Sequence, residues 1–293
     1  MTRASSAGHN KVRPAGVKDL LCRCIGDALR GLRAKGTISD ASIHNARKEL
    51  KRARANLRLL RGFIGEAVYG HENAALRDAA RALSAVRDAK VVMNVLNELR
   101  ERKLNSAQRA LLSDLRSNLE KARLRARREL SQTGALKDTA ESLERASARV
   151  QRWPVPRTAA PLHRGLGHVY RRARDALADV KAEGSPENLH EWRKQVKNLM
   201  HAMDALKTPK ARRISKLIKQ SDSVADALGD DHDLMVLQEK IQGLHSGSHN
   251  AKRALSRRIA QRRKELEWKA LKEGRALFRS TPKAFVKRFR KCL

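Results

Sequence analysis

The stretch that decides the fold is residues 43–60, which read IHNARKELKRARANLRLL. Its apolar residues recur at the period of an α-helix, and on a helical wheel they fill an arc of about 100°, the width of a core-facing stripe. The stripe comprises Ile43, Ala46, Leu50, Ala53, Leu57, Leu60 and, just beyond the quoted stretch, Ile64. The pattern predicts an amphipathic helix with one face in a protein core.

The same pattern returns 146 residues later, where residues 189–206 read LHEWRKQVKNLMHAMDAL. At that shift the shared residues are His44 and His190, Arg47 and Arg193, Lys48 and Lys194, and Lys51 and Lys197. Two flanking blocks align at shifts of 148 upstream and 145 downstream, and the downstream block pairs residues 87–88 with 232–233. Three blocks in one order, at nearly one offset, predict an internal duplication.

A second face of the repeated helix is basic. In the first copy it carries His44, Arg47, Lys48, Lys51, Arg54 and Arg58, and in the second His190, Arg193, Lys194, Lys197 and His201. A run of charge is usually a solvated helix face, which is the alternative interpretation. Solvated faces mix signs, however, because Glu–Lys pairs four residues apart stabilise a helix by about 0.2–0.5 kcal/mol and like charges cost a similar amount. The repeated like charge therefore predicts a phosphate-binding surface, with bidentate Arg and point-charge Lys contacts.

Each of the two basic faces begins with a histidine, His44 or His190. A histidine beside an apolar stripe more often has a structural role, which is the alternative. Neighbouring cations should lower the pKa of such a histidine, whereas a bound phosphate should raise it. We hypothesise that the contacts of both histidines with phosphate depend on pH.

The overall charge of the chain calls for an anionic partner. Lys and Arg number 65 against 31 Asp and Glu, which gives a formal net charge of +34. Self-repulsion on this scale destabilises a compact monomer, so the candidate partners are nucleic acid, an anionic membrane surface and soluble polyphosphate. Aromatic residues make up only 3% of the chain. The base-stacking platforms typical of single-strand binding are therefore scarce.

The helical period continues along almost the whole chain. Helices are expected at about 17–34, 40–68, 71–101, 106–131, 135–151, 162–182, 186–207, 209–228, 231–244, 249–279 and 283–291. The sequence lacks alternating β-branched runs and hairpin-turn signals, which predicts an all-α fold. Three prolines within residues 153–161 separate two halves. We expect a disordered basic tail over 1–16, helical halves over 17–152 and 162–293, and a linker over 153–161.

Sequence signals for a secreted or membrane protein are weak. Cys22, Cys24 and Cys292 have no disulfide-framework spacing, which favours a reducing compartment. No apolar run approaches the roughly 20 residues that a membrane span needs. A cytoplasmic protein without membrane contacts is therefore expected.

The one cluster of acids and histidine that could ligate a metal is residues 230–233, which read DDHD. In the alternative interpretation, which we favour, Gly229 ends or bends one helix and the acids favour the start of the next. Asp88 and Asp233 would then hold arginines in place. No catalytic triad, Cys/His pair or glycine-rich phosphate loop stands out. We expect no metal, no cofactor and no enzymatic activity.

These blocks resemble the CHAD family, the conserved histidine α-helical domain, which carries a His-x-x-Arg-(Lys/Val)-x-x-(Lys/Arg) helix in each half and a downstream (Arg/His)-Asp block. The matching residues are His44, Arg47, Lys48, Lys51 and Arg52, then His190, Arg193, Lys194 and Lys197, and the pairs Arg87-Asp88 and His232-Asp233. Tyr170, Arg171 and Arg174 resemble the basic helix that precedes the second copy. The resemblance covers about 17–290. It weakens at Asn198, Met200 and Asp204, where the first copy has arginines.

The resemblance implies two pseudo-symmetric antiparallel four-helix-type bundles with a basic channel that binds inorganic polyphosphate, and association with polyphosphate granules. We therefore expect non-enzymatic binding of polyphosphate. The alternatives are non-specific nucleic-acid binding and an acidic-protein scaffold. Polyphosphate is favoured because its charge is denser than that of single-stranded DNA and it has no bases to accommodate; weak nucleic-acid binding is expected from electrostatics alone.

Overall fold

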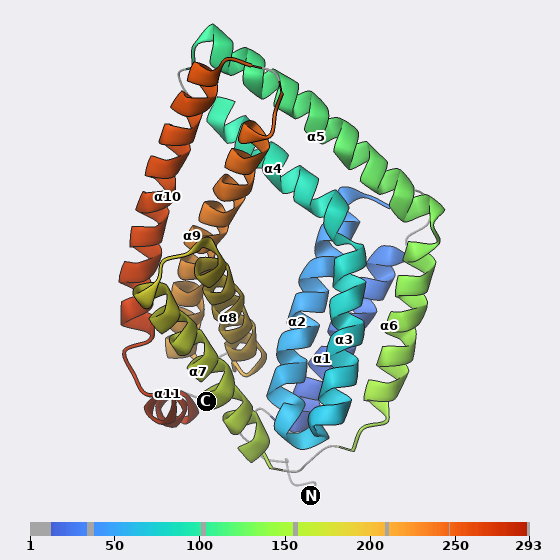
Figure 1. The fold of residues 1–293 in the computed structure, drawn as a ribbon. Helices are drawn as coiled ribbons and strands as arrows, with labels where there is room; N and C mark the ends of the chain where they lie inside the picture. The colour runs from blue at the N-terminus through green and yellow to red at the C-terminus, as the bar shows by residue number, and fades with distance from the viewer. Residues whose placement is uncertain are drawn as a thin grey trace, which may run out of the picture.

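The computed structural model describes residues 13–33, 38–100, 104–154, 158–208, 211–245 and 247–291, without the side chains of residues 85–89, 100 and 131. Within these ranges every regular element is a helix, which confirms the predicted all-α class. The helices are α1 (Pro14–Leu32), α2 (Asp40–Ile64), α3 (Glu66–Ala82), α4 (Ser84–Arg100), α5 (Ser106–Gln132), α6 (Ala135–Gln151), α7 (Ala160–Ala182), α8 (Pro186–Ala205), α9 (Arg212–Gln242), α10 (His249–Leu277) and α11 (Pro282–Arg290) (Figure 1).

The first half forms a four-helix bundle from α1, α2, α3 and α6. Helix α2 packs between α1 and α3, and α6 closes the bundle against both of them (Figure 1). Leu50 and Leu57 of the predicted stripe are fully buried here against Leu21 and Ile25 of α1 and the rest of one continuous core. Gly65 has a φ of +82°, a conformation that glycine adopts without strain, so α3 can begin directly after α2 ends.

The second half is built from α7, α8, α9 and α10, each packed against the next, with α11 lying on α7. Trp192 of α8 is fully buried and lies against Gly274 of α10. A Cβ at position 274 would lie 2.5 Å from Cζ2 of that indole, so only glycine lets α10 approach α8 this closely. The indole of Trp192 therefore packs α8 closely against the C-terminal end of α10.

Helices α4 and α5 pair with each other and bridge the two bundles. From the first bundle, α4 runs across to α9, and α5 reaches α10 and then returns to α6 (Figure 1). The bundles also meet directly, where α2 packs against α7 and α8. A Cβ at Gly165 of α7 would lie only 2.7 Å from the carbonyl oxygen of Leu59 on α2, so the two backbones touch at this seam.

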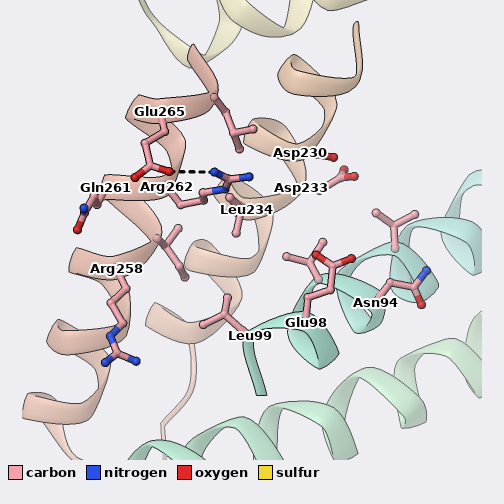
Figure 2. A pocket seen from close by; sticks show the side chains of 14 residues that line it. Asn94, Glu98, Leu99, Asp230, Asp233, Leu234, Arg258, Gln261, Arg262 and Glu265 are labelled. Atoms are coloured by element: carbon pink, nitrogen blue, oxygen red, sulfur yellow. Dashed lines mark hydrogen bonds and ion pairs between the residues drawn. The ribbon is translucent and has the colours of Figure 1, made fainter. Parts of the chain in front are cut away.

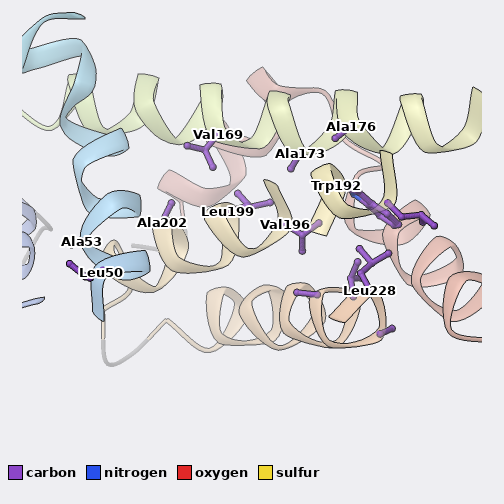
Figure 3. Packing of buried hydrophobic residues seen from close by; sticks show 14 of the residues in the cluster. Leu50, Ala53, Val169, Ala173, Ala176, Trp192, Val196, Leu199, Ala202 and Leu228 are labelled. Atoms are coloured by element: carbon purple, nitrogen blue, oxygen red, sulfur yellow. The ribbon is translucent and has the colours of Figure 1, made fainter. Parts of the chain in front are cut away.

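The core is continuous across the seam. Figure 3 shows Val169 and Ala173 of α7 over Leu199 of α8, with Ala53 of α2 near the C-terminal end of α8. All four side chains are buried. The two halves therefore form one hydrophobic unit with two bundles.

Three predicted helix boundaries were wrong. The helix expected over 40–68 ends at Ile64, and α3 begins at Glu66. The helix expected over 71–101 is broken at Leu83, where a turn separates α3 from α4 and redirects the chain toward α9. The helices expected over 209–228 and 231–244 are one helix, α9, so Gly229 neither ends nor starts a helix. Its neighbour Asp231 is buried in the helix interior and accepts a hydrogen bond from Nε of Arg263 at 2.7 Å.

The helices that flank the expected tail and linker begin a few residues earlier than the sequence predicted. Helix α1 begins at Pro14, so the last residues of the expected tail are helical, while residues 1–12 lie outside the described ranges. The linker over 153–161 is shortened by α7, which begins at Ala160. The two halves share an order of elements in which the continuous α9 takes the place of α3 and α4. The duplication itself stays a prediction.

Candidate anion-binding site

A cavity of about 690 Å³ lies between the two bundles, where α2 and α3 face α8 and α9 beneath α4. Its described lining holds eight arginines and lysines against two carboxylates, Glu191 and Asp233. The cations are Arg47, Lys51, Arg54, Arg58, Arg77, Arg193, Lys194 and Lys197. This excess of positive charge in a partly enclosed space favours an anionic ligand.

Helix α2 supplies one wall through its basic face. Arg47, Lys51, Arg54 and Arg58 are three or four residues apart and therefore lie in one row, about 4.5–6 Å apart along the helix axis. The opposite face of α2 is anchored in the core by the buried stripe. Burial of that stripe fixes which way the cations point.

Helix α8 supplies the facing wall in the same manner. His190, Arg193, Lys194, Lys197 and His201 line the cavity, while Trp192, Val196 and Leu199 on the other face are buried. Ser185 caps the helix by accepting a hydrogen bond from the backbone N–H of Asn188. The structure thus brings together the basic faces of the two copies that the sequence singles out.

Neighbouring groups orient several of these cations. Nη1 of Arg47 donates to the carbonyl oxygen of Ala80, which ties α2 to α3. Nε of Arg54 donates to Oδ1 of Asn73 at 3.0 Å, and Nζ of Lys197 donates to Oδ1 of Asp226 at 3.4 Å. The cations are therefore held by α3 and α9 as well as by their own helices.

The guanidinium of Arg193 is positioned by a glycine. A Cβ at Gly229 of α9 would lie 3.0 Å from Nη2 and 3.3 Å from Nε of Arg193. The arginine therefore lies flat over a bare stretch of helix backbone. Any larger residue at position 229 would require the guanidinium of Arg193 to shift.

Burial disfavours charge in this cavity. It lowers the pKa of Arg54 to about 10, with a further contribution from Arg58, whose own pKa is also lowered by burial. Burial, His232 and Lys194 lower the pKa of His190 to about 4. Burial, Lys197 and Arg52 lower the pKa of His201 to about 3. At neutral pH the arginines stay charged and these two histidines are neutral, so an anion would relieve the repulsion among the cations.

Comparison with known proteins establishes the family. The family model for the CHAD domain matches residues 23–242, about three quarters of the chain. The chain belongs to the CHAD domain family. Members of this family are linked to polyphosphate binding in general. None of the curated proteins matches the chain.

Two solved structures are similar to this CHAD domain. PptA from Streptomyces chartreusis superposes with a TM-score of 0.62 at 17% identity, covering 92% of this chain and 99% of that one. The CHAD domain from the plant Ricinus communis superposes with a TM-score of 0.57 at 16% identity, covering 95% of this chain and 96% of that one. At such identities the likeness shows a shared fold.

Six of the residues predicted to bind polyphosphate do not line the cavity of this CHAD domain: His44, Lys48, Arg52, Tyr170, Arg171 and Arg174. Arg52 makes an ion pair with Glu49 at 3.0 Å, although it lies close enough to His201 to lower the pKa of that histidine, as does Lys48. Arg171 and Arg174 are exposed on α7.

Tyr170 has a structural position instead of a ligand-facing one. It is fully buried, and its ring stacks on Phe285 of α11 with centroids 4.0 Å apart. Its hydroxyl donates to the carbonyl oxygen of Ser280 at 3.0 Å. Position 170 therefore holds α11 against α7. The side chain of Asp88, predicted to orient an arginine, lies outside the described residues, whereas Asp233 lines the cavity.

Arg77 and His232 are the basic lining residues that the sequence analysis did not predict to bind polyphosphate. Arg77 comes from α3, outside both repeated helices, so no motif pointed to it. His232 stands in the block that aligns with Arg87, and that alignment was a usable signal. The centroid of its ring lies 4.4 Å from that of the His190 ring.

A second cavity, of about 790 Å³, lies between α4 and the α9–α10 pair and shares Val91 and Asp233 with the first (Figure 2). Its described lining mixes signs, because two arginines are accompanied by four carboxylates: Arg258 and Arg262 with Glu98, Asp230, Asp233 and Glu265. Arg262 and Glu265 already form an ion pair at 2.9 Å. Although larger, this cavity therefore suits a polyanion less well than the first.

The remaining expectations concern metals and membranes. Among the described residues, no group of three or more His, Cys, Asp or Glu is arranged to hold a metal ion. None of the described helices is both long enough and apolar enough to span a bilayer.

Proposed function

We propose that this CHAD domain binds inorganic polyphosphate, without enzymatic turnover, in the cavity between its two bundles. The observation that carries the proposal is the convergence of eight arginines and lysines from α2, α3 and α8 on one described cavity with two carboxylates. Phosphate oxygens would accept bidentate hydrogen bonds from arginine and pair with the lysine charges.

The spacing of the cations favours a polymer over a single phosphate. The row from Arg47 to Arg58 on α2 extends over about 16 Å, and α8 presents a second row opposite it. One phosphate could neutralise only part of these rows. A chain of phosphates would counter the repulsion along both walls at once.

The lining also favours polyphosphate over nucleic acid. Apart from its charged groups and histidines, the described lining consists of Val91, Val92, Val236, Gln195 and Asn198, with no Phe, Tyr or Trp for a base to stack on. It also offers no Ser, Thr or Cys as a nucleophile, and Glu191 pairs with Lys194. These features support binding of an unadorned phosphate chain without cleavage. Cytoplasmic localisation and association with polyphosphate granules are part of the same proposal.

Substitution of Arg193 and Lys197 by alanine tests the proposal. Loss of two charged contacts, each worth about 1.5–3 kcal/mol, should weaken binding of long-chain polyphosphate by at least about 100-fold. The matched control is Lys216→Ala with Lys219→Ala, which removes the same charge from an exposed part of α9. Affinity would be measured by calorimetry at about 150 mM salt, because affinities for polyanions depend on salt.

Two results would contradict the proposal. One is an equal loss of affinity in the cavity variant and the surface control, which would indicate a diffuse charge effect. The other is displacement of polyphosphate from the cavity by DNA at the same salt concentration.

A further inference from the structure

The outer side of α10 carries an exposed tryptophan. Trp268 is 65% exposed, more than the other two exposed large hydrophobic residues among those described, Val68 at 39% and Leu124 at 42%. The apolar stripe of α10 is buried on the other side, at Leu266 and Ala270 for example. Packing of the helix therefore does not account for an aromatic residue at position 268.

Cations surround this tryptophan on the same face of the helix. Lys264 and Lys272 stand four residues before and after it, about 6 Å away along the axis, and Arg275 stands seven residues after it. All three are exposed. Nζ of Lys272 lies 5.0 Å from the centroid of the indole ring, which leaves much of the ring open to solvent. The one acid on this face, Glu265, pairs with Arg262 at 2.9 Å.

We propose that this Trp268 face, formed by Lys264, Trp268, Lys272 and Arg275, binds single-stranded nucleic acid. An unpaired base would stack on the indole, and the phosphates on either side of that base would meet the lysines and the arginine. Stacking of bases on aromatic side chains flanked by cations is a sequence-tolerant mode of single-strand binding. The proposed ligand is therefore RNA or DNA without a required sequence.

The Trp268 face is separate from the cavity between the bundles. The described lining of that cavity contains no residue of α10, and α10 forms an outer edge of the molecule (Figure 1). The inference is thus independent of the proposed polyphosphate function. The two sites also differ in chemistry, because the cavity has no aromatic platform and the Trp268 face is built around one.

A membrane surface is a weaker match for the same residues. Helices that lie in a lipid interface bury a broad apolar face in the bilayer. The apolar face of α10 is already buried in the protein, and its exposed side offers one aromatic residue among charges. A single tryptophan suits a stacked base better than an acyl layer.

The test compares two substitutions at position 268 in the full chain. Binding of a fluorescent oligo(dT) of about 20 nucleotides would be followed by anisotropy at about 150 mM salt. Trp268→Ala should weaken binding by about 5- to 150-fold, and Trp268→Phe should restore most of the affinity because it keeps a stacking ring. Both variants should bind polyphosphate like the unmodified protein. Arg193→Ala with Lys197→Ala should instead weaken polyphosphate binding and leave oligonucleotide binding unchanged.

The charges of the face have their own test and control. Lys264→Ala with Lys272→Ala should weaken oligonucleotide binding, whereas the surface control Lys216→Ala with Lys219→Ala should change it far less. Equal oligonucleotide affinity for Trp268→Ala and the unmodified protein would overturn the proposal. So would binding to vesicles with about 30% anionic lipid that depends on Trp268 while oligonucleotide binding does not.

Discussion

The centroids of the imidazole rings of His190 on α8 and His232 on α9 lie 4.4 Å apart, and the ring planes are tilted by 40° to each other. Burial, with His232 as a further contribution, lowers the pKa of His190 to about 4, and Nδ1 of His190 is buried without a hydrogen bond to any described residue. His201 lies further along the same wall with a pKa of about 3. Two neutral imidazoles therefore stand in a cavity lined by cations.

This arrangement predicts that binding of polyphosphate takes up protons. A phosphate beside His190 or His201 would stabilise the protonated ring and raise its pKa, so affinity should increase as the pH falls from about 7 to about 5. The charged groups that line the cavity beside these rings include Lys194, Lys197 and Asp233, and His232 faces His190 directly. Calorimetry in buffers of different ionisation enthalpy would measure the proton uptake.

The matched variants are His190→Ala with His201→Ala, and His71→Ala on the exposed surface of α3 as the control. The double variant should flatten the pH dependence, while His71→Ala should retain it. An affinity that stays constant over this pH range in the unmodified protein would show that the histidines do not sense the ligand.

The stability of the ligand-free protein should change with pH in the opposite sense. Because the pKa values of His190 and His201 in the folded protein lie below the ordinary 6.5, protons bind more tightly to the unfolded chain. The free energy of unfolding should therefore decrease as the pH falls from about 6.5 to about 4. Thermal unfolding across that range, with and without polyphosphate, measures the effect, and the double histidine variant should lose less stability on acidification.

Gly229→Ala should separate binding from stability. Alanine is favoured over glycine inside a helix by about 1 kcal/mol, so the melting temperature should hold or rise. The new Cβ would displace the guanidinium of Arg193, and polyphosphate affinity should fall by about 10-fold. Gly62→Ala on α2 is the control, because a Cβ there meets nothing within 4 Å and should leave affinity unchanged. Undiminished affinity in Gly229→Ala would mean that the position of Arg193 is unimportant.

Asp231→Ala should destabilise the fold much more than Asp230→Ala. The carboxylate of Asp231 is 3% exposed and bonds to Arg263, which is 17% exposed, so its removal leaves a largely buried guanidinium with only the more distant Glu267, at 3.8 Å, as an ion-pair partner among the described residues. Breaking such a pair costs about 3 kcal/mol. Asp230 is exposed, so its removal should change the free energy of unfolding by less than about 1 kcal/mol. Urea unfolding of both variants would show the difference, and equal losses would contradict the role assigned to the α9–α10 pair.

The sequence predicted the two basic walls because each belongs to a long helix whose apolar stripe dictates its orientation. Once Leu50 and Leu57, or Val196 and Leu199, are in the core, the cations three or four residues away must share a face. Because the two copies align residue by residue, the basic face stands at the same angle to the apolar stripe in both helices. Nine of the fifteen residues predicted to bind polyphosphate therefore line one cavity.

Tertiary packing decided the features that local sequence did not show. Glycine usually suggests a helix end, but Gly229 lies inside α9, where the guanidinium of Arg193 packs against its backbone. Tyr170 lies beside exposed arginines in sequence, yet α11 draws its ring into the core from more than 100 residues away. Arg77 reaches the cavity because α3 packs against α2. Each depends on a partner that is distant in the chain.

The seam between Gly165 and Leu59 has a consequence for how fast a ligand can bind. Backbones in direct contact cannot slide or open without breaking the continuous core beside them, so the spacing of the two basic walls is set when the chain folds. Association then needs no domain closure, and its kinetics should follow a single exponential whose rate rises steeply as ionic strength falls. The positive charge of the cavity should raise the association rate of every polyanion in a similar way. Differences in affinity among polyanions should therefore arise mainly from their dissociation rates.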